Sequence, residues 1–121
     1  MPAAVPALDD ARIISLLTQA KLRAGNNDWT TPPGSSAVDR YRQVIRLDPD
    51  NEEAKQGIVA AFDFFLRRGN ELAAAGDPAG ARVRYGKARA VLESAGVEAH
   101  LTDLAERRVM LDQALVALEQ H

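Results

Sequence analysis

Cationic side chains gather on two segments of the sequence and have the clearest potential chemistry. Arg40 and Arg84 stand 44 positions apart, and Arg82 and Arg89 lie on either side of Arg84. Guanidinium groups bind carboxylates through paired hydrogen bonds, so this set suits an acidic peptide or a free carboxylate. The alternative is a solvated surface that nearby acidic residues neutralise, because most surface charges have no further role.

Aromatic residues are the second group of candidates. Phe62 and Phe65 fall on one face of a predicted helix, where they offer apolar contact to a partner. Trp29 lies in "NNDWTTPPGSSA", a run of residues that break regular structure. It could stack on a ligand, but we favour packing between the helices on either side, because a large apolar side chain is more often core than site.

Residues for catalysis or metal binding are sparse. The chain has no cysteine, which excludes disulfides, thiol chemistry and Cys-based zinc sites. His100 and His121 are isolated, and no pair has the spacing of metal ligands on a helix. No Ser–His–acid order and no glycine-rich phosphate loop is evident. We therefore expect a protein that is not an enzyme and that uses neither metal nor cofactor.

Composition sets the class of partner. The chain has 121 residues, enough for one domain, and a net charge of −2 with both signs spread along it. Without a basic tract, nucleic acid is not the expected partner. No apolar stretch is long enough to span a membrane, so we expect a soluble protein without direct membrane insertion.

The elements that position these residues can be predicted from the spacing of the apolar residues along the chain. This spacing predicts helices only. A linker or an added remnant is expected at 1–7, which suggests a module from a longer chain. Helices are expected at 8–24, 36–47, 52–75, 78–93 and 97–119, with a long loop at 26–35. Asp50 with Glu53 matches a capping pair for the third helix, Gly76 ends that helix, and Asp77 caps the fourth.

An internal repeat links the second and fourth helices. "SAVDRYRQVIRLDPDN" aligns with "GARVRYGKARAVLESA", so that Ala37 matches Ala81 and Tyr41 matches Tyr85 at a constant offset of 44. The small residue lets a neighbouring helix approach, and the aromatic residue fills the next gap. A repeat of this length built from helix pairs is typical of an α-solenoid.

These residues resemble the tetratricopeptide repeat (TPR). The order small, aromatic, small precedes Pro49 in "LDPDN", and Gly69 fits the same pattern in the next unit. Residues 13–92, with "WTTPPGSSAVDRYRQVIRLDPDNEEAKQGI" and "GDPAGA", are similar to accessory segments of larger proteobacterial envelope or signalling proteins. The chain departs from the family in its repeat length, since the ordinary repeat has about 34 residues. Arg68 and Glu93 also stand where the family usually has leucine and proline.

The resemblance implies an all-α fold: a short right-handed α-solenoid of two TPR-like helix pairs over 8–93, plus a C-terminal capping helix over 97–119. The residues expected to hold it together are Trp29, Ala37, Tyr41, Pro49, Gly69, Ala81 and Tyr85. It also implies a scaffold that binds a peptide or a neighbouring domain, in the bacterial cytoplasm or on the periplasmic side of an envelope protein. The alternative is homo-oligomerisation, in which a second copy completes the short solenoid; the leucines of the last helix then form a dimer seam instead of a cap.

Overall fold

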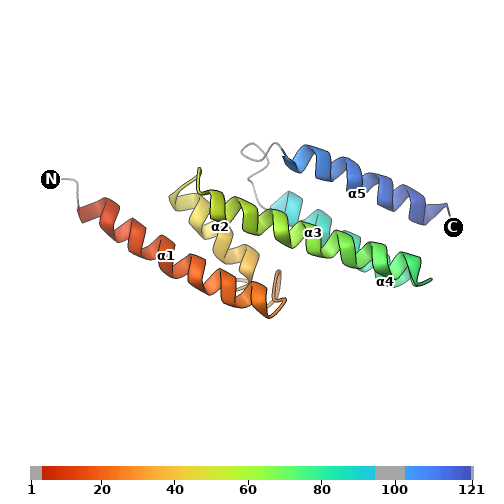
Figure 1. Cartoon of the computed structure of the whole chain (residues 1–121), viewed down its shortest axis with the longest axis horizontal. Helices are drawn as coiled ribbons and strands as arrows, with labels where there is room; N and C mark the ends of the chain where they lie inside the picture. Colours follow the sequence, from red (N-terminus) through yellow and green to blue (C-terminus); the bar gives the residue numbers. More distant parts are fainter. Residues whose placement is uncertain (1–3, 95–102, 121) are drawn as a thin grey trace. The chain divides into compact units, whose positions relative to one another are not determined.

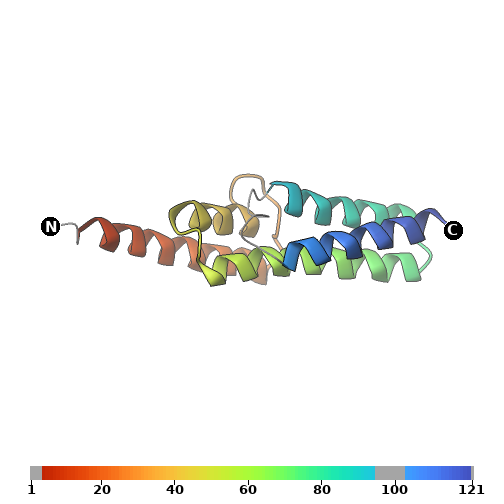
Figure 2. The ribbon, with the colours of Figure 1, turned by 90° about the horizontal axis from the view of Figure 1, so that it is seen from above.

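The computed structural model describes residues 4–94 and 103–120, and these residues form helices without any strand. The helices are α1 (Ala4–Gly25), α2 (Ala37–Leu47), α3 (Glu52–Ala74), α4 (Pro78–Ser94) and α5 (Asp103–Glu119), shown in Figures 1 and 2. The all-α class predicted from the sequence is therefore confirmed. The chain divides into two compact units, Met1–Ile58 and Val59–His121, and the boundary falls inside α3.

The first unit is built on the packing of α1 against α2. Tyr41 of α2 is buried, and its ring occupies the place where Gly57 of α3 would carry a Cβ atom. Position 57 therefore requires glycine because the Tyr41 ring lies so close to it, and not because of its backbone conformation. The rest of this core is small or aliphatic, and its buried residues are Leu16, Ala20, Ala37, Val38, Val44, Ile45, Ala54 and Ile58.

The second unit has a similar contact between a glycine and a tyrosine ring. Helix α3 again supplies the glycine, and the tyrosine comes from α4, the helix that follows it. A Cβ atom on Gly69 of α3 would lie 2.5 Å from Cε1 of Tyr85, which is 2% exposed on α4. The Tyr85 hydroxyl donates a hydrogen bond of 2.6 Å to Oδ1 of Asn70. The remaining core residues are Ala61, Phe62, Phe65, Leu66, Ala81, Ala88, Val91, Leu92, Leu111 and Leu118.

Two helices end in the same hydrogen-bond pattern. After α1, the Asn27 and Asp28 N–H groups donate to the carbonyls of Ala24 and Arg23 at 2.9 and 2.8 Å. Asn27 has a φ of 60°, a left-handed conformation that asparagine tolerates better than most residues. Gly76 takes this position after α3 with a φ of +84°, which confirms the predicted stop at Gly76.

Side-chain caps start the later helices. The Ser36 hydroxyl accepts from the Asp39 N–H, and the Asp39 carboxylate accepts from the Ser36 N–H, both at 3.2 Å. Asp77 caps α4 as predicted, with Oδ1 2.9 Å from the Gly80 nitrogen. The predicted cap of α3 is wrong, because Oδ1 of Asn51 accepts from the Ala54 N–H at 2.9 Å. Asn51 stands one residue nearer to the helix than Asp50 and so reaches its third amide.

The N-terminal boundary also differs from the prediction. Helix α1 begins at Ala4, within the segment 1–7 that we expected to be a linker. Alanine is the strongest helix former, and Pro6 falls in the first turn, where its missing N–H leaves no hydrogen bond unmade. The helix predicted over 97–119 is described from Asp103, and its earlier residues lie outside the described part of the chain.

Candidate functional site

A depression of about 470 Å³ lies beside the C-terminal end of α1 and includes a predicted site residue. Its lining residues are Gln19, Leu22 and Arg23 from α1, Asn26 directly after α1, and Arg40 from α2. The α1 residues are spaced by three and four, so they share one face of that helix. Leu22 is 66% exposed, which leaves an apolar side chain in water beside two guanidinium groups. We call these five residues the arginine pocket.

The two arginines of the arginine pocket have more hydrogen-bond donors than their contacts within the protein use. Arg23 lies 3.8 Å from Oδ2 of Asp28, and Arg40 donates to Oε1 of Gln43 at 3.4 Å. Both contacts are long, and a guanidinium has five N–H donors, so each arginine has more donors than these contacts use. The nearest acid on α2, Asp39, accepts from Ser36 in the helix cap and lies 3.7 Å from Arg42. A carboxylate in the pocket would therefore meet two cations.

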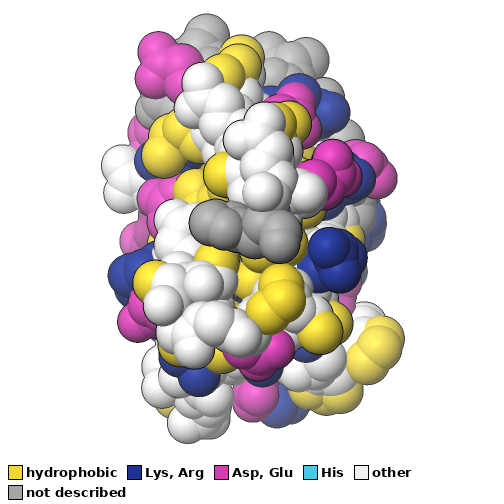
Figure 3. All heavy atoms as spheres, turned by 90° about the vertical axis from the view of Figure 1, so that its right-hand side faces the viewer, with side chains coloured by type: hydrophobic (Ala, Val, Ile, Leu, Met, Phe, Trp, Pro, Cys, Tyr) yellow, Lys and Arg dark blue, Asp and Glu magenta, His cyan; other side chains and the backbone are white. Residues whose placement is uncertain are grey.

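The other predicted arginines lie in the second unit, on α4. Arg82 is exposed and Arg84 is half-buried, while Nη2 of Arg89 lies 3.8 Å from Oδ1 of Asp112 on α5. Arg40 belongs to the first unit, where it lines the same depression as Arg23. On the face seen in Figure 3, cationic and anionic side chains are mixed and do not form fields of one sign.

The predicted apolar contact surface is wrong. Phe62 is fully buried and Phe65 is 4% exposed, so neither can touch a partner while the unit is folded. Phe65 packs edge-on against Phe64, with ring centroids 5.3 Å apart, and Nζ of Lys87 lies 5.7 Å from its ring centroid. A short unit has few large apolar side chains, and its core uses the ones that the sequence placed on a helix face.

The residues predicted to be structural are mostly in the core. Ala37, Tyr41, Ala81 and Tyr85 are at most 5% exposed, and Gly69 is buried. Burial raises the pKa of both tyrosines; at Tyr41 the Glu53 carboxylate raises the pKa further and Lys21 opposes it. Pro49 is exposed and acts through the backbone, because Asp48 before it is extended and α2 ends at Leu47.

Trp29 is half-buried, and its indole nitrogen is inaccessible to solvent. Its carbonyl accepts from the Val38 N–H at 2.9 Å, and the Asp28 carbonyl accepts from the Ala37 N–H at 3.0 Å. These two bonds tie the loop after α1 to the first turn of α2. A solvent-facing indole would have favoured ligand stacking, and the observed burial favours packing instead.

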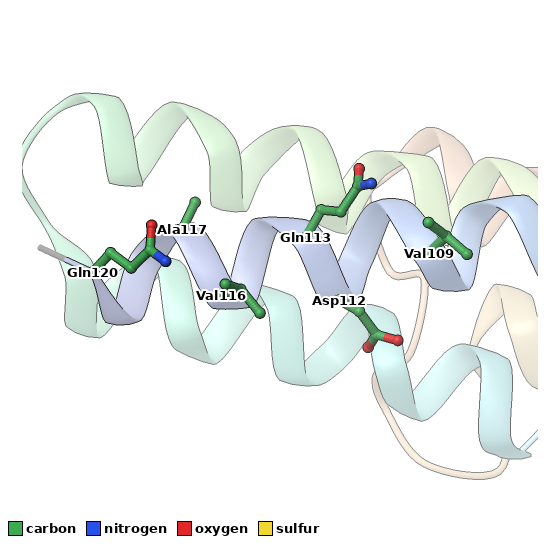
Figure 4. Close-up of a pocket in the computed structure, with 6 residues that line it drawn as sticks. All are labelled: Val109, Asp112, Gln113, Val116, Ala117 and Gln120. Atoms are coloured by element: carbon green, nitrogen blue, oxygen red, sulfur yellow. The ribbon is translucent and has the colours of Figure 1, made fainter.

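Two features of α5 were not predicted. Nε and Nη2 of Arg107 donate to the two carboxylate oxygens of Asp63 on α3, at 2.9 and 3.1 Å. On another side of α5, Val109 and Val116 are 54% and 53% exposed along a depression of about 390 Å³. Figure 4 shows the side chains that line it, five from α5 and one from the residue directly after it: Val109, Asp112, Gln113, Val116, Ala117 and Gln120. The sequence signal was a second apolar spacing of seven, beside the leucine stripe.

Two further observations concern the described residues only. Their acidic side chains form no cluster of three that could hold a metal ion. None of their helices combines the length and the apolar character that crossing a membrane requires.

The described residues thus form helices, with a polar, arginine-lined depression in the first unit and an exposed apolar face on α5. Comparison of the chain with protein-family models, with curated proteins and with solved structures finds no match.

Proposed function

We propose that this protein is a non-catalytic interaction module that binds an acidic segment of a protein or peptide in the arginine pocket. One observation carries the proposal: Arg40, selected from the sequence, lines a depression together with a second arginine and an exposed leucine. Two guanidinium groups suit carboxylates, and Leu22 suits an apolar side chain next to the acid in the bound segment.

The amides in the pocket have a complementary use. Gln19 donates through Nε2 to Oγ of Ser15 at 3.1 Å, which leaves its carbonyl oxygen able to accept from a peptide N–H. Asn26 at the helix end offers both a donor and an acceptor. A segment that contains an acid and an apolar residue would thus find charge, apolar contact and backbone hydrogen bonds within one face of α1 and the start of α2.

We further propose that the two helix pairs, α1 with α2 and α3 with α4, are TPR-like repeats of a short right-handed α-solenoid that α5 caps. The buried tyrosines at the matched positions 41 and 85 support this architecture. The buried alanines at the matched positions 37 and 81 support it as well. Scaffolding between proteins or between domains of a longer chain is the function that this architecture suits.

Peptide binding tests the proposed site. The probes are a fluorescein-labelled peptide of alternating glutamate and leucine and a lysine–leucine peptide of equal length, compared by fluorescence anisotropy. We expect the acidic peptide alone to bind, and Arg40→Gln or Arg23→Gln to weaken it about tenfold, as loss of a charged hydrogen bond would. Arg46→Gln is the matched control, because Arg46 is exposed on α2 outside the pocket. Equal binding of both peptides, or equal effects of Arg40→Gln and Arg46→Gln, would refute the site.

Self-association is a second candidate function, because α5 carries half-exposed valines on a side that does not enter the core. The leucine stripe that could have formed a dimer seam does enter the core, since Leu111 and Leu118 are 1% and 6% exposed. Any seam on this helix must therefore use other residues.

A further inference from the structure

We propose that the side of α5 bearing Val109 and Val116 is a self-association surface whose occupant is α5 of a second copy, running antiparallel. The proposal is independent of the arginine pocket, which lies in the other unit of the chain.

Helix α5 has two apolar stripes, although a helix that packs on one side needs only one. Leu111 and Leu118 form the first stripe and are buried in the second unit, where α5 packs against α4. Val109 and Val116 form the second stripe, and each leaves about half of its surface in water. Each pair is seven residues apart, two helical turns, so its members lie nearly in line along the helix. Within the described residues of the second unit, no element covers the second stripe.

The depression along the second stripe suits a helix better than a small molecule. It measures about 390 Å³, and every residue that lines it is exposed and belongs to α5 or directly follows it (Figure 4). A small-molecule site usually encloses most of its ligand between several elements. A single helix face with two valines and amides at Gln113 and Gln120 instead resembles half of a helix–helix interface, with an apolar centre and a polar edge.

Charge complementarity identifies a second copy as the occupant. Arg108 directly precedes Val109 and Glu119 follows Val116 by three residues, so the two charges bracket the stripe. At 100° per residue both charges lie on the same flank of α5. A two-fold axis midway between the valines puts Val109 opposite Val116 of the second copy and Arg108 beside Glu119 of the second copy. In a parallel two-fold pair, the flanks of the two copies that carry these residues would lie on opposite sides of the seam, so the charges would not pair.

The acid nearest the two-fold axis is already balanced within its own chain. Asp112 lies midway between the valines, where two copies would bring their carboxylates together. Nη2 of Arg89 lies 3.8 Å from Oδ1 of Asp112, which supplies a cation for each carboxylate. The interface therefore has an apolar centre, balanced acids at the axis and opposite charges at both ends.

Sedimentation velocity over a concentration series up to about 1 mM measures the association directly. We expect a monomer–dimer equilibrium and an at least tenfold weaker dimer for Val116→Glu. Val83→Glu is the matched control, because Val83 lies on α4 outside the depression and is 57% exposed. It should change the dissociation constant less than about twofold. A monomer at every concentration, or a dimer that Val116→Glu leaves unchanged, would overturn the proposal.

Charge exchange tests the antiparallel register. Arg108→Glu and Glu119→Arg should each weaken self-association by about tenfold, because each creates two like-charge contacts in an antiparallel dimer. Both positions are exposed, and Glu119→Arg also places a positive charge at the C-terminal end of α5, so both variants should fold, with unchanged circular dichroism. Mixed together, the two variants should restore wild-type affinity as a heterodimer, since all four charges are then paired. Failure of the mixture to associate would overturn the register.

Discussion

The close approach of Gly69 to Tyr85 predicts how the substitution Gly69→Ala changes the stability of the protein. A methyl group at position 69 would lie 2.5 Å from Cε1 of Tyr85, against about 3.5–4.0 Å for a comfortable carbon contact. The ring cannot easily swing away, because its hydroxyl is held at 2.6 Å by Asn70. Gly69→Ala should therefore force an overpacked core, which costs about 1–3 kcal/mol. Helix propensity opposes this by about 1 kcal/mol, because alanine is a better helix former than glycine.

Comparison with Gly86→Ala separates the cost of overpacking in Gly69→Ala from the gain in helix propensity. Gly86 lies within α4 of the same unit, is exposed, and would have nothing within 4 Å of its new methyl group. It should gain about 1 kcal/mol from propensity alone. The two variants should therefore differ by about 1–3 kcal/mol, or roughly 4–12 °C in melting temperature for a chain of this size.

Thermal and urea unfolding followed by far-UV circular dichroism measures this difference. Repeating Gly69→Ala in a Tyr85→Leu background completes a double-mutant cycle, and there the added methyl group should no longer destabilise. If Gly69→Ala and Gly86→Ala stabilise the protein equally, the contact between the glycine and the tyrosine ring does not limit packing, and the reasoning is refuted.

Four further perturbations test other contacts. Tyr85→Phe should destabilise the protein by about 1 kcal/mol in urea unfolding, because it removes the hydrogen bond from the hydroxyl. The free energy of unfolding should fall as pH rises above 10: burial raises the pKa of Tyr41 and Tyr85 above 10.0, so the unfolded chain loses these protons first. Tyr85→Phe should reduce that slope, and a slope unchanged in the variant would contradict the assignment. Arg107→Gln should cost about 1 kcal/mol and lose its effect in high salt, because it breaks the paired bonds to Asp63. Leu111→Ala should cost about 2–5 kcal/mol, measured in the same way, since Leu111 is 1% exposed.

Local signals in the sequence predicted the fold class and most helix limits well. Helix α2 ends before Pro49, α3 ends before Gly76, and α4 follows Asp77, because each of these residues acts on the backbone within a few positions. The start of α1 was missed because Pro6 suggested a linker, although proline is compatible with a first helical turn.

Contacts between distant residues were harder to predict. Gly57 follows Tyr41 by sixteen residues and Tyr85 follows Gly69 by the same separation, yet only Gly69 was selected. The family-like pattern drew attention to Gly69, and nothing local distinguishes Gly57 from a glycine that merely weakens a helix. The bonds between Arg107 and Asp63 join residues 44 apart, and periodicity within a helix cannot reveal which charges meet.

The prediction that Phe62 and Phe65 contact a partner was wrong, and the physical reason also indicates where binding residues should be sought. Phe62 and Phe65 lie on a clear apolar face of their helix, and that is the face a small unit must bury to fold. A partner can contact only apolar residues that the core leaves outside, and these depart from the main stripe of their helix. Leu22 and Val116 are such residues, and each lies in a depression on the surface. In a chain of short amphipathic helices, an apolar residue outside the core stripe is therefore a better candidate for binding than a larger one within it.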